Sequence, residues 1–354
     1  MIIYYAHPYG FTCSFSLVAK KHVEYLTKYK YATVIATGGL VTSSRTYDAV
    51  VLHPYVAFHP MVKGRVKGKA WIGIEVCDSD KISNSAVEVL NTADKVILPS
   101  NYCVNVYRNS GVKSKLTMIP HGVEDYYYTL PNQWWSKNTL TLKWLYDYKA
   151  KSGKRILLFW YWYRAERKGW SEVRELWSRL KRERKDVALV VKTIANSPIS
   201  PVEAKNLDVV LVREWLSEHA KLLLYDLADI TLLFSWSGGF ELNCLESLTR
   251  LTPCIAHNKG PWVDYLPEYL RVKAGEKVVA IPGNKIHVGY GYRVDVEDAL
   301  SKIHDILENH DDYKAKLKEY RDKVLREEYT WSKIAWRLYR EIREEVELKK
   351  QIAS

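Results

Sequence analysis

The sequence predicts an α/β protein of two consecutive domains, each built around a parallel, doubly wound sheet. Short β-rich runs alternate with helical patterns through residues 2–120, the alternation stops between residues 126 and 153, and it restarts at residue 155. Alternation at this spacing favours parallel strands joined by helical crossovers. The length of 354 residues also exceeds the size at which one hydrophobic core usually keeps growing, so two domains are expected.

The first domain is expected to span residues 1–150, with a linker from about residue 126. Runs of aliphatic, aromatic and β-branched side chains predict strands at residues 2–6, 32–36, 49–53, 70–76, 95–99 and 116–120. Helical periodicity predicts helices near residues 15–29, 85–91 and 102–110. The aromatic, polar and basic stretch at residues 126–153 has no clean period, so the linker is placed there.

The second domain is expected to span residues 151–330 and to repeat the same construction. The pattern predicts strands at residues 155–162, 187–193, 209–213, 230–235 and 253–257, and helices at 171–181, 217–227 and 242–250. The chain is expected to be helical from residue 296. Ser332 is the expected N-cap of a last amphipathic helix that reaches about residue 350 and packs back on the first domain.

Composition indicates an ordinary globular protein, with 47% apolar and 27% charged residues. The longest strongly apolar run, residues 156–163, is far shorter than the roughly 20 residues that span a bilayer, and no signal segment opens the chain. A cytoplasmic protein is therefore expected. Five cysteines are odd in number, widely spaced and without a C-x-x-C pair, which predicts buried thiols rather than a disulfide framework or a zinc site.

The formal net charge of +12 predicts an anionic partner, which the sign alone leaves open between nucleic acid, anionic lipid and nucleotide-sugar. The 26 Tyr and 13 Trp against 3 Met, with abundant Lys, Arg and Glu, favour a thermophilic source. The first helix carries Lys20, Lys21, Lys28 and Lys30 beside apolar residues. It would either rest on anionic lipid as a peripheral contact or pack on its own sheet.

Residues 235–248 combine the end of a buried strand, a glycine-bearing turn and the start of a helix. This arrangement presents backbone N–H groups to an anionic ligand. Gly238 and Gly239 lack side chains, so sugar or phosphate oxygens could approach the backbone there; otherwise they form a simple strand-to-helix turn. The candidate substrate-binding residues of this turn are Ser237, Gly238, Gly239, Phe240 and Leu242.

Several further segments extend this motif into a series. They are residues 93–102, 110–112, 119–123, 164–169, 228–229 and 331–335. In order and spacing, the series resembles the retaining glycosyltransferases of family 4 over about residues 71–346. The resemblance implies a GT-B fold, in which two Rossmann-like domains face each other across a cleft. It also implies a retaining hexosyltransferase that moves a sugar from a nucleotide diphosphate to an acceptor hydroxyl.

The family's motif has a Glu, seven residues and a second Glu. The second acid matches Glu246, the first falls on Gly238, and an acid stands instead at Glu241, where the family commonly has glycine. By resemblance, Glu246 accepts hydrogen bonds from the ribose hydroxyls; the alternative is an exposed pair with Arg250. Glu241 is a candidate catalytic residue that contacts sugar hydroxyls, or it merely favours the helix N-terminus electrostatically.

A basic cluster before the helix at residue 171 contains Arg164 and Lys168. Cations oppose the macrodipole at a helix N-terminus, so an anion between them would explain the cluster; the alternative is a solvated basic loop. By resemblance these residues hold the donor's diphosphate. Lys168 matches the family's Lys-Gly directly, whereas Arg164 sits closer to it than the family's arginine does.

The first domain is expected to contribute acceptor contacts and a loop that approaches the donor phosphate through Gly10. Asp78, at the end of a candidate strand, would bind acceptor hydroxyls or stabilise a cationic transition state; Ser79 or Asp80 could instead cap a helix. His121 would face the cleft or form the hinge turn. Ser100 is a further candidate substrate-binding residue.

No motif for a metal or cofactor is evident, so no metal is expected and the nucleotide-sugar serves as co-substrate. The donor base and sugar remain open, with UDP- and GDP-sugars as candidates, and the acceptor is a glycan, lipid or protein. Two other functions stay open. One is a DNA-modifying sugar transferase or nucleic-acid binder, although no basic repeat or helix-turn-helix accompanies the charge; the other is a sugar-nucleotide epimerase of the same fold.

Overall fold

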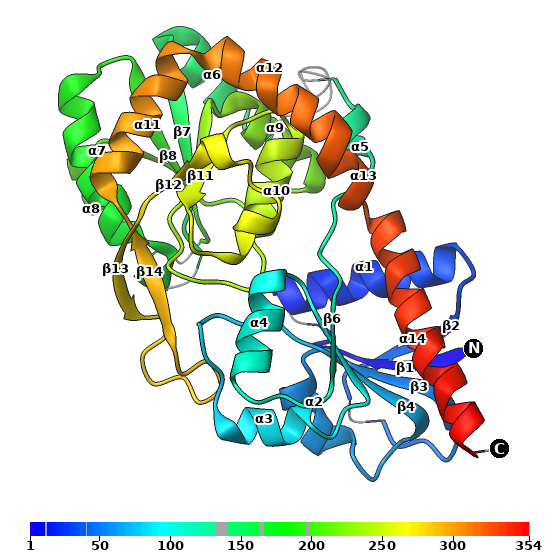
Figure 1. The fold of residues 1–354 in the computed structure, drawn as a ribbon. Helices are drawn as coiled ribbons and strands as arrows, with labels where there is room; N and C mark the ends of the chain where they lie inside the picture. Colours follow the sequence, from blue (N-terminus) through cyan, green and yellow to red (C-terminus); the bar gives the residue numbers. More distant parts are fainter. Residues whose placement is uncertain (11–12, 40, 132–140, 163–165, 196–197, 354) are drawn as a thin grey trace.

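The chain folds into two α/β domains, each with a six-stranded parallel sheet (Figure 1). A computed structural model describes residues 1–10, 13–39, 41–131, 141–162, 166–195 and 198–353. The first sheet has the order β2-β1-β3-β4-β5-β6 and the second β12-β11-β10-β7-β8-β9, with a separate antiparallel pair β13-β14. The expected two-domain α/β fold is confirmed.

The elements of the first domain alternate as the sequence predicts. Its strands are β1 (Ile2–Ala6), β2 (Thr33–Thr37), β3 (Thr46–Leu52), β4 (Lys67–Ile74), β5 (Lys95–Leu98) and β6 (Lys115–Met118). The helices up to the second sheet are α1 (Ser14–Lys28), α2 (Tyr55–Val62), α3 (Asn84–Leu90), α4 (Asn101–Asn109), α5 (Tyr126–Thr129) and α6 (Lys143–Ser152). The last two lie in the segment expected to be an irregular linker.

The second domain repeats this alternation and adds a hairpin. Its strands are β7 (Arg155–Trp160), β8 (Val187–Lys192), β9 (Val209–Val212), β10 (Ile230–Leu233), β11 (Cys254–His257), β12 (Arg271–Val272), β13 (Ala274–Val279) and β14 (Tyr290–Val294). The helices are α7 (Trp170–Glu183), α8 (Pro201–Leu207), α9 (Glu218–Leu227), α10 (Leu242–Thr249), α11 (Val296–Glu308), α12 (His310–Tyr320), α13 (Arg326–Glu328) and α14 (Trp331–Ala353). Short 3₁₀ turns lie at Glu166–Lys168, Pro261–Asp264 and Glu268–Leu270, and a π-helical turn at Arg321–Leu325.

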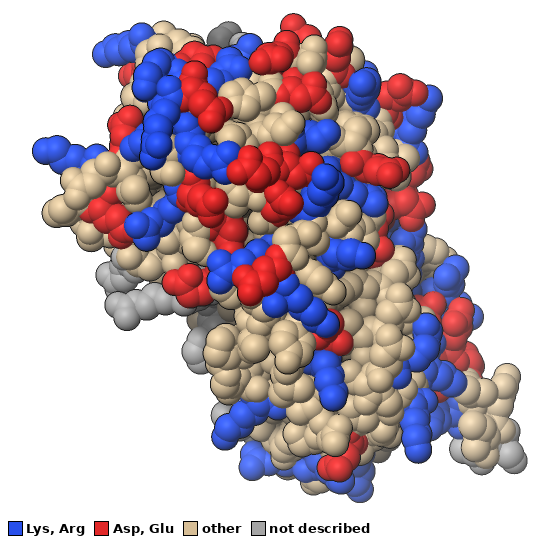
Figure 2. All heavy atoms as spheres, turned by 60° about the vertical axis from the view of Figure 1, so that its left-hand side comes forward, with Lys and Arg blue, Asp and Glu red and all other residues tan. Residues whose placement is uncertain are grey.

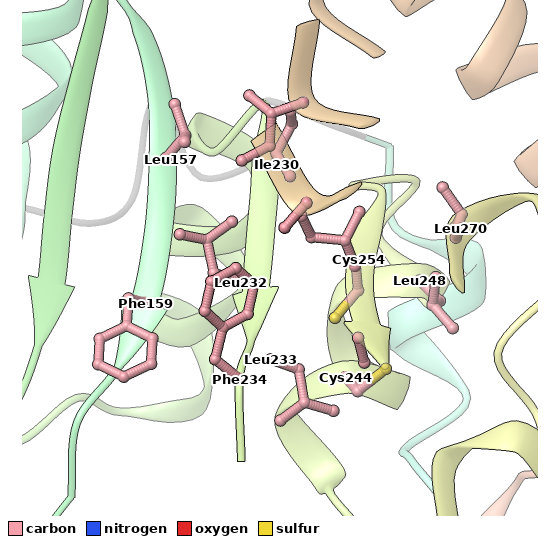
Figure 3. Packing of buried hydrophobic residues seen from close by; sticks show 14 of the residues in the cluster. Leu157, Phe159, Ile230, Leu232, Leu233, Phe234, Cys244, Leu248, Cys254 and Leu270 are labelled. Carbon is pink, nitrogen blue, oxygen red and sulfur yellow. The ribbon is translucent and has the colours of Figure 1, made fainter. Parts of the chain in front are cut away.

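Apolar side chains cover both faces of each sheet, which explains why the strands read as nearly continuous apolar runs. Figure 3 shows the packing on one face of the second sheet, where Leu157, Ile230 and Leu232 from neighbouring strands meet Cys254 and Leu248. Each of these five side chains is fully buried. The sheet is therefore a rigid support for the loops at its carboxyl edge.

The C-terminal helix α14 returns to the first domain, as expected (Figure 1). Its apolar face, including Ile334 and Leu338, packs in one cluster with Ile3 and Tyr5 of β1. The helix begins at Trp331, so the expected N-cap Ser332 lies inside the first turn. The helix therefore contributes to the core of the first domain.

Helix α1 packs on its own sheet, the second of the two interpretations of its basic and apolar residues. Val18, Tyr25 and Leu26 are buried in the cluster that contains β1 and α14. Among the described residues, no helix is long and apolar enough to cross a bilayer.

The positive charge is not gathered into one stripe on the face shown in Figure 2. Over the second domain, Lys and Arg side chains are interleaved with Asp and Glu. Many of them are paired; Arg179, for example, forms an ion pair with Glu297. On this face the second domain therefore lacks the continuous basic footprint typical of a nucleic-acid binder.

Candidate active site

The glycine-bearing turn lies between the carboxyl end of β10 and the start of α10. Helix α10 begins at Leu242, directly after Glu241, so its first backbone N–H groups face the turn. Gly238 leaves a space that the carboxylate of Glu241 fills: a Cβ atom on Gly238 would lie 3.0 Å from Oε1 of Glu241. The carboxylate of Glu241 therefore lies in the space that a side chain at residue 238 would occupy.

Lys168 lies against the same turn and pairs with Glu241. Its Nζ is 2.6 Å from Oε1 of Glu241, and the side chains are only 18% and 10% exposed. Lys168 is thus not part of a solvated loop, which removes that alternative for this residue. Arg164, the other expected diphosphate ligand, lies outside the described residues.

Gly169 sets how closely the Lys168 loop approaches β10. Its φ is +80°, and a Cβ atom there would lie 2.2 Å from the backbone oxygen of Phe234. Residues other than glycine rarely adopt this backbone conformation. Only glycine therefore allows Lys168 to sit over the turn.

Replacing Gly169 with alanine is expected to destabilise the fold by roughly 3 kcal/mol, since backbone strain and a steric clash add. The matched control is Gly153→Ala, where φ is +65° but nothing lies within 4 Å of the added Cβ. In that variant only the backbone strain acts, and it should lower the free energy of unfolding by about 1 kcal/mol. Urea unfolding monitored by circular dichroism compares the two, and equal losses would contradict the close approach at Gly169.

Asp78 reaches the same turn from the first domain. Its carboxylate lies 3.3 Å from the guanidinium of Arg167, and its backbone oxygen accepts a hydrogen bond from the hydroxyl of Ser237. Arg167 also donates to the backbone oxygen of Ser237 at 3.2 Å. Asp78, Arg167 and Ser237 therefore bring the two domains together beside Lys168.

The neighbouring residues Ser79 and Asp80 do not cap a helix, contrary to the alternative for this segment. The N-cap of α3 is Ser83, whose hydroxyl accepts from Ala86 N. Asp80 instead accepts from Tyr290 N at 2.7 Å. Ser79 accepts from Gly289 N at 3.2 Å.

The β13–β14 hairpin that supplies Gly289 and Tyr290 bridges the domains. Its loop pairs with the first domain through an isolated bridge between Ile82 and His287. Lys277 forms an ion pair with Asp80 at 2.8 Å. Figure 1 shows this hairpin extending from the second domain toward the loop between β4 and α3. The hairpin therefore joins the two domains at this edge.

Glu246 is buried on α10 and held by two groups of α9. Lys221 donates to Oε1 and Tyr225 to Oε2, each at 2.7 Å. The expected alternative, an exposed pair with Arg250, is wrong: Arg250 is buried and pairs with Asp226 at 2.7 Å. The carboxylate is thus fixed in place before any ligand arrives.

Burial and charge act together on this group. Burial raises the pKa of Glu246, and the neighbouring ammonium of Lys221 offsets part of that rise. Burial alone would lower the pKa of Lys221, but Glu246 and Glu218 raise it above its ordinary value. Each carboxylate oxygen has further lone pairs, so Glu246 can still accept hydrogen bonds from a vicinal diol.

The remaining residues of the turn form the contact between domains. Ser100 caps α4 by accepting from Cys103 N, and its hydroxyl donates to the backbone oxygen of Gly239 at 3.0 Å. A Cβ atom on Gly239 would lie 2.6 Å from Cβ of Val76. Leu242 packs against the first domain's core. Gly239 is therefore required for close approach of the two domains.

His121 lies at the hinge and also against the turn. Its ring is 5.0 Å from that of Phe240 and 6.3 Å from that of Trp331, measured between centroids. Burial lowers its pKa to about 3, so the imidazole is neutral, and no described residue forms a hydrogen bond with Nδ1. His121 therefore packs against the turn, and its expected contact with a ligand remains a prediction.

Gly10 stands apart from these contacts. It has a φ of +86° and nothing within 4 Å of the place a Cβ would take. No described atom therefore crowds the position that a side chain at residue 10 would take. Its expected approach to a phosphate remains a prediction.

Four residues that contact the predicted site residues were not predicted from the sequence. Lys221 and Tyr225 hold Glu246, Arg167 joins Asp78 to the turn, and Nδ1 of His287 accepts a hydrogen bond from the backbone N–H of Asp78 at 3.4 Å. The spacing of Lys221 and Tyr225, four apart on one helix face, is a signal that could have paired them with an acid. Among the described residues, no group of three or more His, Cys, Asp or Glu is arranged to hold a metal ion.

Comparisons with known proteins show a family match and a shared fold. Residues 184–338 match the family described as "Family 4 Glycosyltransferase in conflict systems". A curated relative, "Uncharacterized protein 356" of Sulfolobus islandicus rod-shaped virus 1, is 30% identical over 336 residues, which cover 90% of this chain and 91% of the relative.

Solved structures share the fold at low identity. A sucrose-phosphate synthase from Thermosynechococcus elongatus superposes with a TM-score of 0.68 at 13% identity, covering 97% of this chain and 98% of that one. A UDP-forming α,α-trehalose-phosphate synthase from Burkholderia xenovorans, in complex with glucose-6-phosphate, has a TM-score of 0.64 at 12% identity, covering 83% and 72%. Both are similar to this chain in architecture.

Proposed function

Because the chain belongs to the family 4 glycosyltransferases, we propose that it moves a sugar from a nucleotide diphosphate donor to an acceptor hydroxyl, with retention at the anomeric carbon. The observation that carries the proposal is the ion pair between Lys168 and Glu241 over the glycine turn at the start of α10. It places a cation, an acid and free helix N–H groups around one point. These are the groups that a sugar diphosphate requires.

The diphosphate would lie between Lys168 and the first turn of α10. Its negative charge would replace the carboxylate of Glu241 as the partner of the ammonium group, and the helix N-terminus would add backbone donors. Arg167, which is 21% exposed at its side chain, lies beside the same turn. The cost of separating Lys168 from Glu241 would be offset by the two charges of the ligand.

Release from Lys168 would leave the carboxylate of Glu241 beside the sugar. As the bond to the leaving phosphate stretches, positive charge develops at the anomeric carbon, and a fixed carboxylate stabilises it. The leaving phosphate would deprotonate the acceptor hydroxyl on the same face, which gives retention. Asp78 and His121 would orient the acceptor, and no step is assigned to a metal ion.

Glu246 would hold the ribose. Two vicinal hydroxyls can donate to one carboxylate, and Lys221 and Tyr225 already fix the orientation of this one. One similar solved structure is described as trehalose-6-phosphate from E. coli bound with UDP-2-fluoro glucose. It has a TM-score of 0.62 to this chain at 10% identity. A donor with a ribose diphosphate is therefore the kind that we propose.

The test of the proposed function is consumption of nucleotide-sugars. Purified protein is incubated with UDP-, GDP- and ADP-sugars, first alone and then with candidate sugar acceptors, and release of nucleoside diphosphate is measured. We expect one donor to be turned over slowly by water and faster with an acceptor, and NMR to show the donor's anomeric configuration in the product. Inverted product would contradict retention, and no turnover of any donor would contradict the transfer itself.

Replacing Glu246 with glutamine is expected to weaken nucleoside diphosphate binding roughly 10-fold or more, because hydrogen bonds to a charged acceptor are lost. Isothermal titration calorimetry measures the effect. The matched control is Glu218→Gln, since Glu218 also pairs with Lys221, at 3.1 Å, but is 46% exposed at its side chain. The assignment of Glu246 to the ribose would be contradicted if the wild type and both variants bound each nucleoside diphosphate with the same dissociation constant.

A further inference from the structure

We propose that Cys77 and Cys103 form a disulfide bond that ties the segment after β4 to the start of α4, where the first domain contacts the second. Their Sγ atoms are 2.9 Å apart, and both residues are fully buried. Cys77 follows β4, and Cys103 lies in the first turn of α4. A disulfide needs about 2.05 Å between the sulfur atoms, so closing the bond requires the two sulfur atoms to approach further.

This pair lies where the two domains meet. Sγ of Cys103 is 3.6 Å from the backbone oxygen of Gly239. A Cβ atom on Gly239 would lie 3.2 Å from the backbone nitrogen of Cys77. A bond between the two sulfurs therefore ties together the two segments against which Gly239 packs. The inference does not depend on the reaction that the protein catalyses.

The bond requires an oxidant, and a disulfide such as oxidised glutathione supplies one. A thiolate of the pair attacks the glutathione disulfide, releases one glutathione thiol and forms a mixed disulfide; the second cysteine then displaces the other glutathione. Two protein thiols are oxidised to one disulfide, and one glutathione disulfide is reduced to two thiols. Atoms and electrons balance without another co-reactant.

Burial decides when this exchange takes place. It raises the pKa of the Cys77 thiol well above its ordinary value, so the folded protein contains little of the reactive thiolate. The exchange is thus expected before the chain is fully packed. Once formed, the bond is shielded from reductants by the same burial.

Other cysteines provide the comparison. Cys244 and Cys254 lie in the apolar core of the second domain (Figure 3), where burial raises the pKa of Cys254 as well. Cys13 is half-buried, just before α1. Counting the free thiols alone would not show which cysteines are oxidised. The experiment therefore has to identify which two cysteines are linked.

The experiment refolds the full chain with a mixture of oxidised and reduced glutathione, and in parallel with dithiothreitol. Free thiols are alkylated, the protein is digested without reductant, and peptides are identified by mass spectrometry. We expect a linked peptide that joins Cys77 to Cys103 in the glutathione sample alone. We also expect its melting temperature to exceed that of the dithiothreitol sample by roughly 5 °C, because the bond closes a loop in the unfolded chain.

Cys77→Ser and Cys103→Ser are expected to lose both the linked peptide and the gain in melting temperature, whereas Cys13→Ser keeps both. Mapping of the wild type remains decisive if either serine variant fails to fold. The proposal is overturned if both cysteines are alkylated in the folded, glutathione-treated wild type. It is equally overturned if Cys244 and Cys254 form the linked peptide in place of this pair.

Discussion

Lys168→Ala is expected to reduce sugar transfer by about 100-fold or more, because a cation aimed at developing phosphate charge contributes mainly in the transition state. The same change removes the partner of Glu241, which is 2.6 Å away and largely buried. Some stability should therefore be lost as well, about 1–3 kcal/mol for an acid left without its hydrogen bond. Initial rates of nucleoside diphosphate release and urea unfolding measure the two effects.

The double variant Lys168→Ala/Glu241→Gln separates these effects. A neutral amide at residue 241 needs no counter-charge, so stability should return toward that of the wild type. Transfer should stay low because both the cation and the carboxylate beside the sugar are missing. Recovery of transfer together with stability would mean that Lys168 acts only through the fold.

Substitutions that remove the acid from residue 241 or add one at residue 238 are expected to have the second large effect on sugar transfer. Glu241→Gly should lower transfer by about 100-fold, since the carboxylate beside the sugar is gone. Gly238→Glu should also lower it, because a side chain at 238 would meet Oε1 of Glu241 at 3.0 Å from its Cβ and bring two like charges together. Steady-state rates with the donor that the turnover assay selects give the comparison.

The combined variant Gly238→Glu/Glu241→Gly should recover much of the lost activity. It removes the clash and places the acid where the family's motif has it, and φ at Gly238 lies outside the left-handed region. The two substitutions therefore compensate rather than add, as expected for groups that share one space. A double variant no more active than the worse single variant would contradict the shared position.

Local patterns explain what could be predicted from the sequence. The alternation of strands and helices depends on side-chain periodicity within each element, so it is visible without the fold. Lys168 and Gly169 belong to one short motif, and Glu246 belongs to another. Each motif could be recognised separately, and the structure places Lys168 on the turn that leads to the helix of Glu246.

Contacts between distant segments explain what could not be predicted. Lys168 and Glu241 are 73 positions apart, and only the packing of the 166–168 turn against the end of β10 brings them together. Cys77 and Cys103 are 26 positions apart, so their spacing gives no sign of a pair. The β13–β14 hairpin was missed although residues 282–284, Pro-Gly-Asn, stand between two β-rich runs and are typical of a turn.

Thermal unfolding in the presence of nucleoside diphosphates tests the proposed donor site most directly. A ligand that binds only the native state at 100 times its dissociation constant adds about 2.7 kcal/mol of stability. We expect UDP, GDP or ADP to raise the melting temperature of the wild type by several degrees, and the same nucleotide to raise that of Lys168→Ala/Glu241→Gln much less. No rise with any nucleoside diphosphate at millimolar concentration, or an equal rise in both proteins, would contradict a donor site at Lys168.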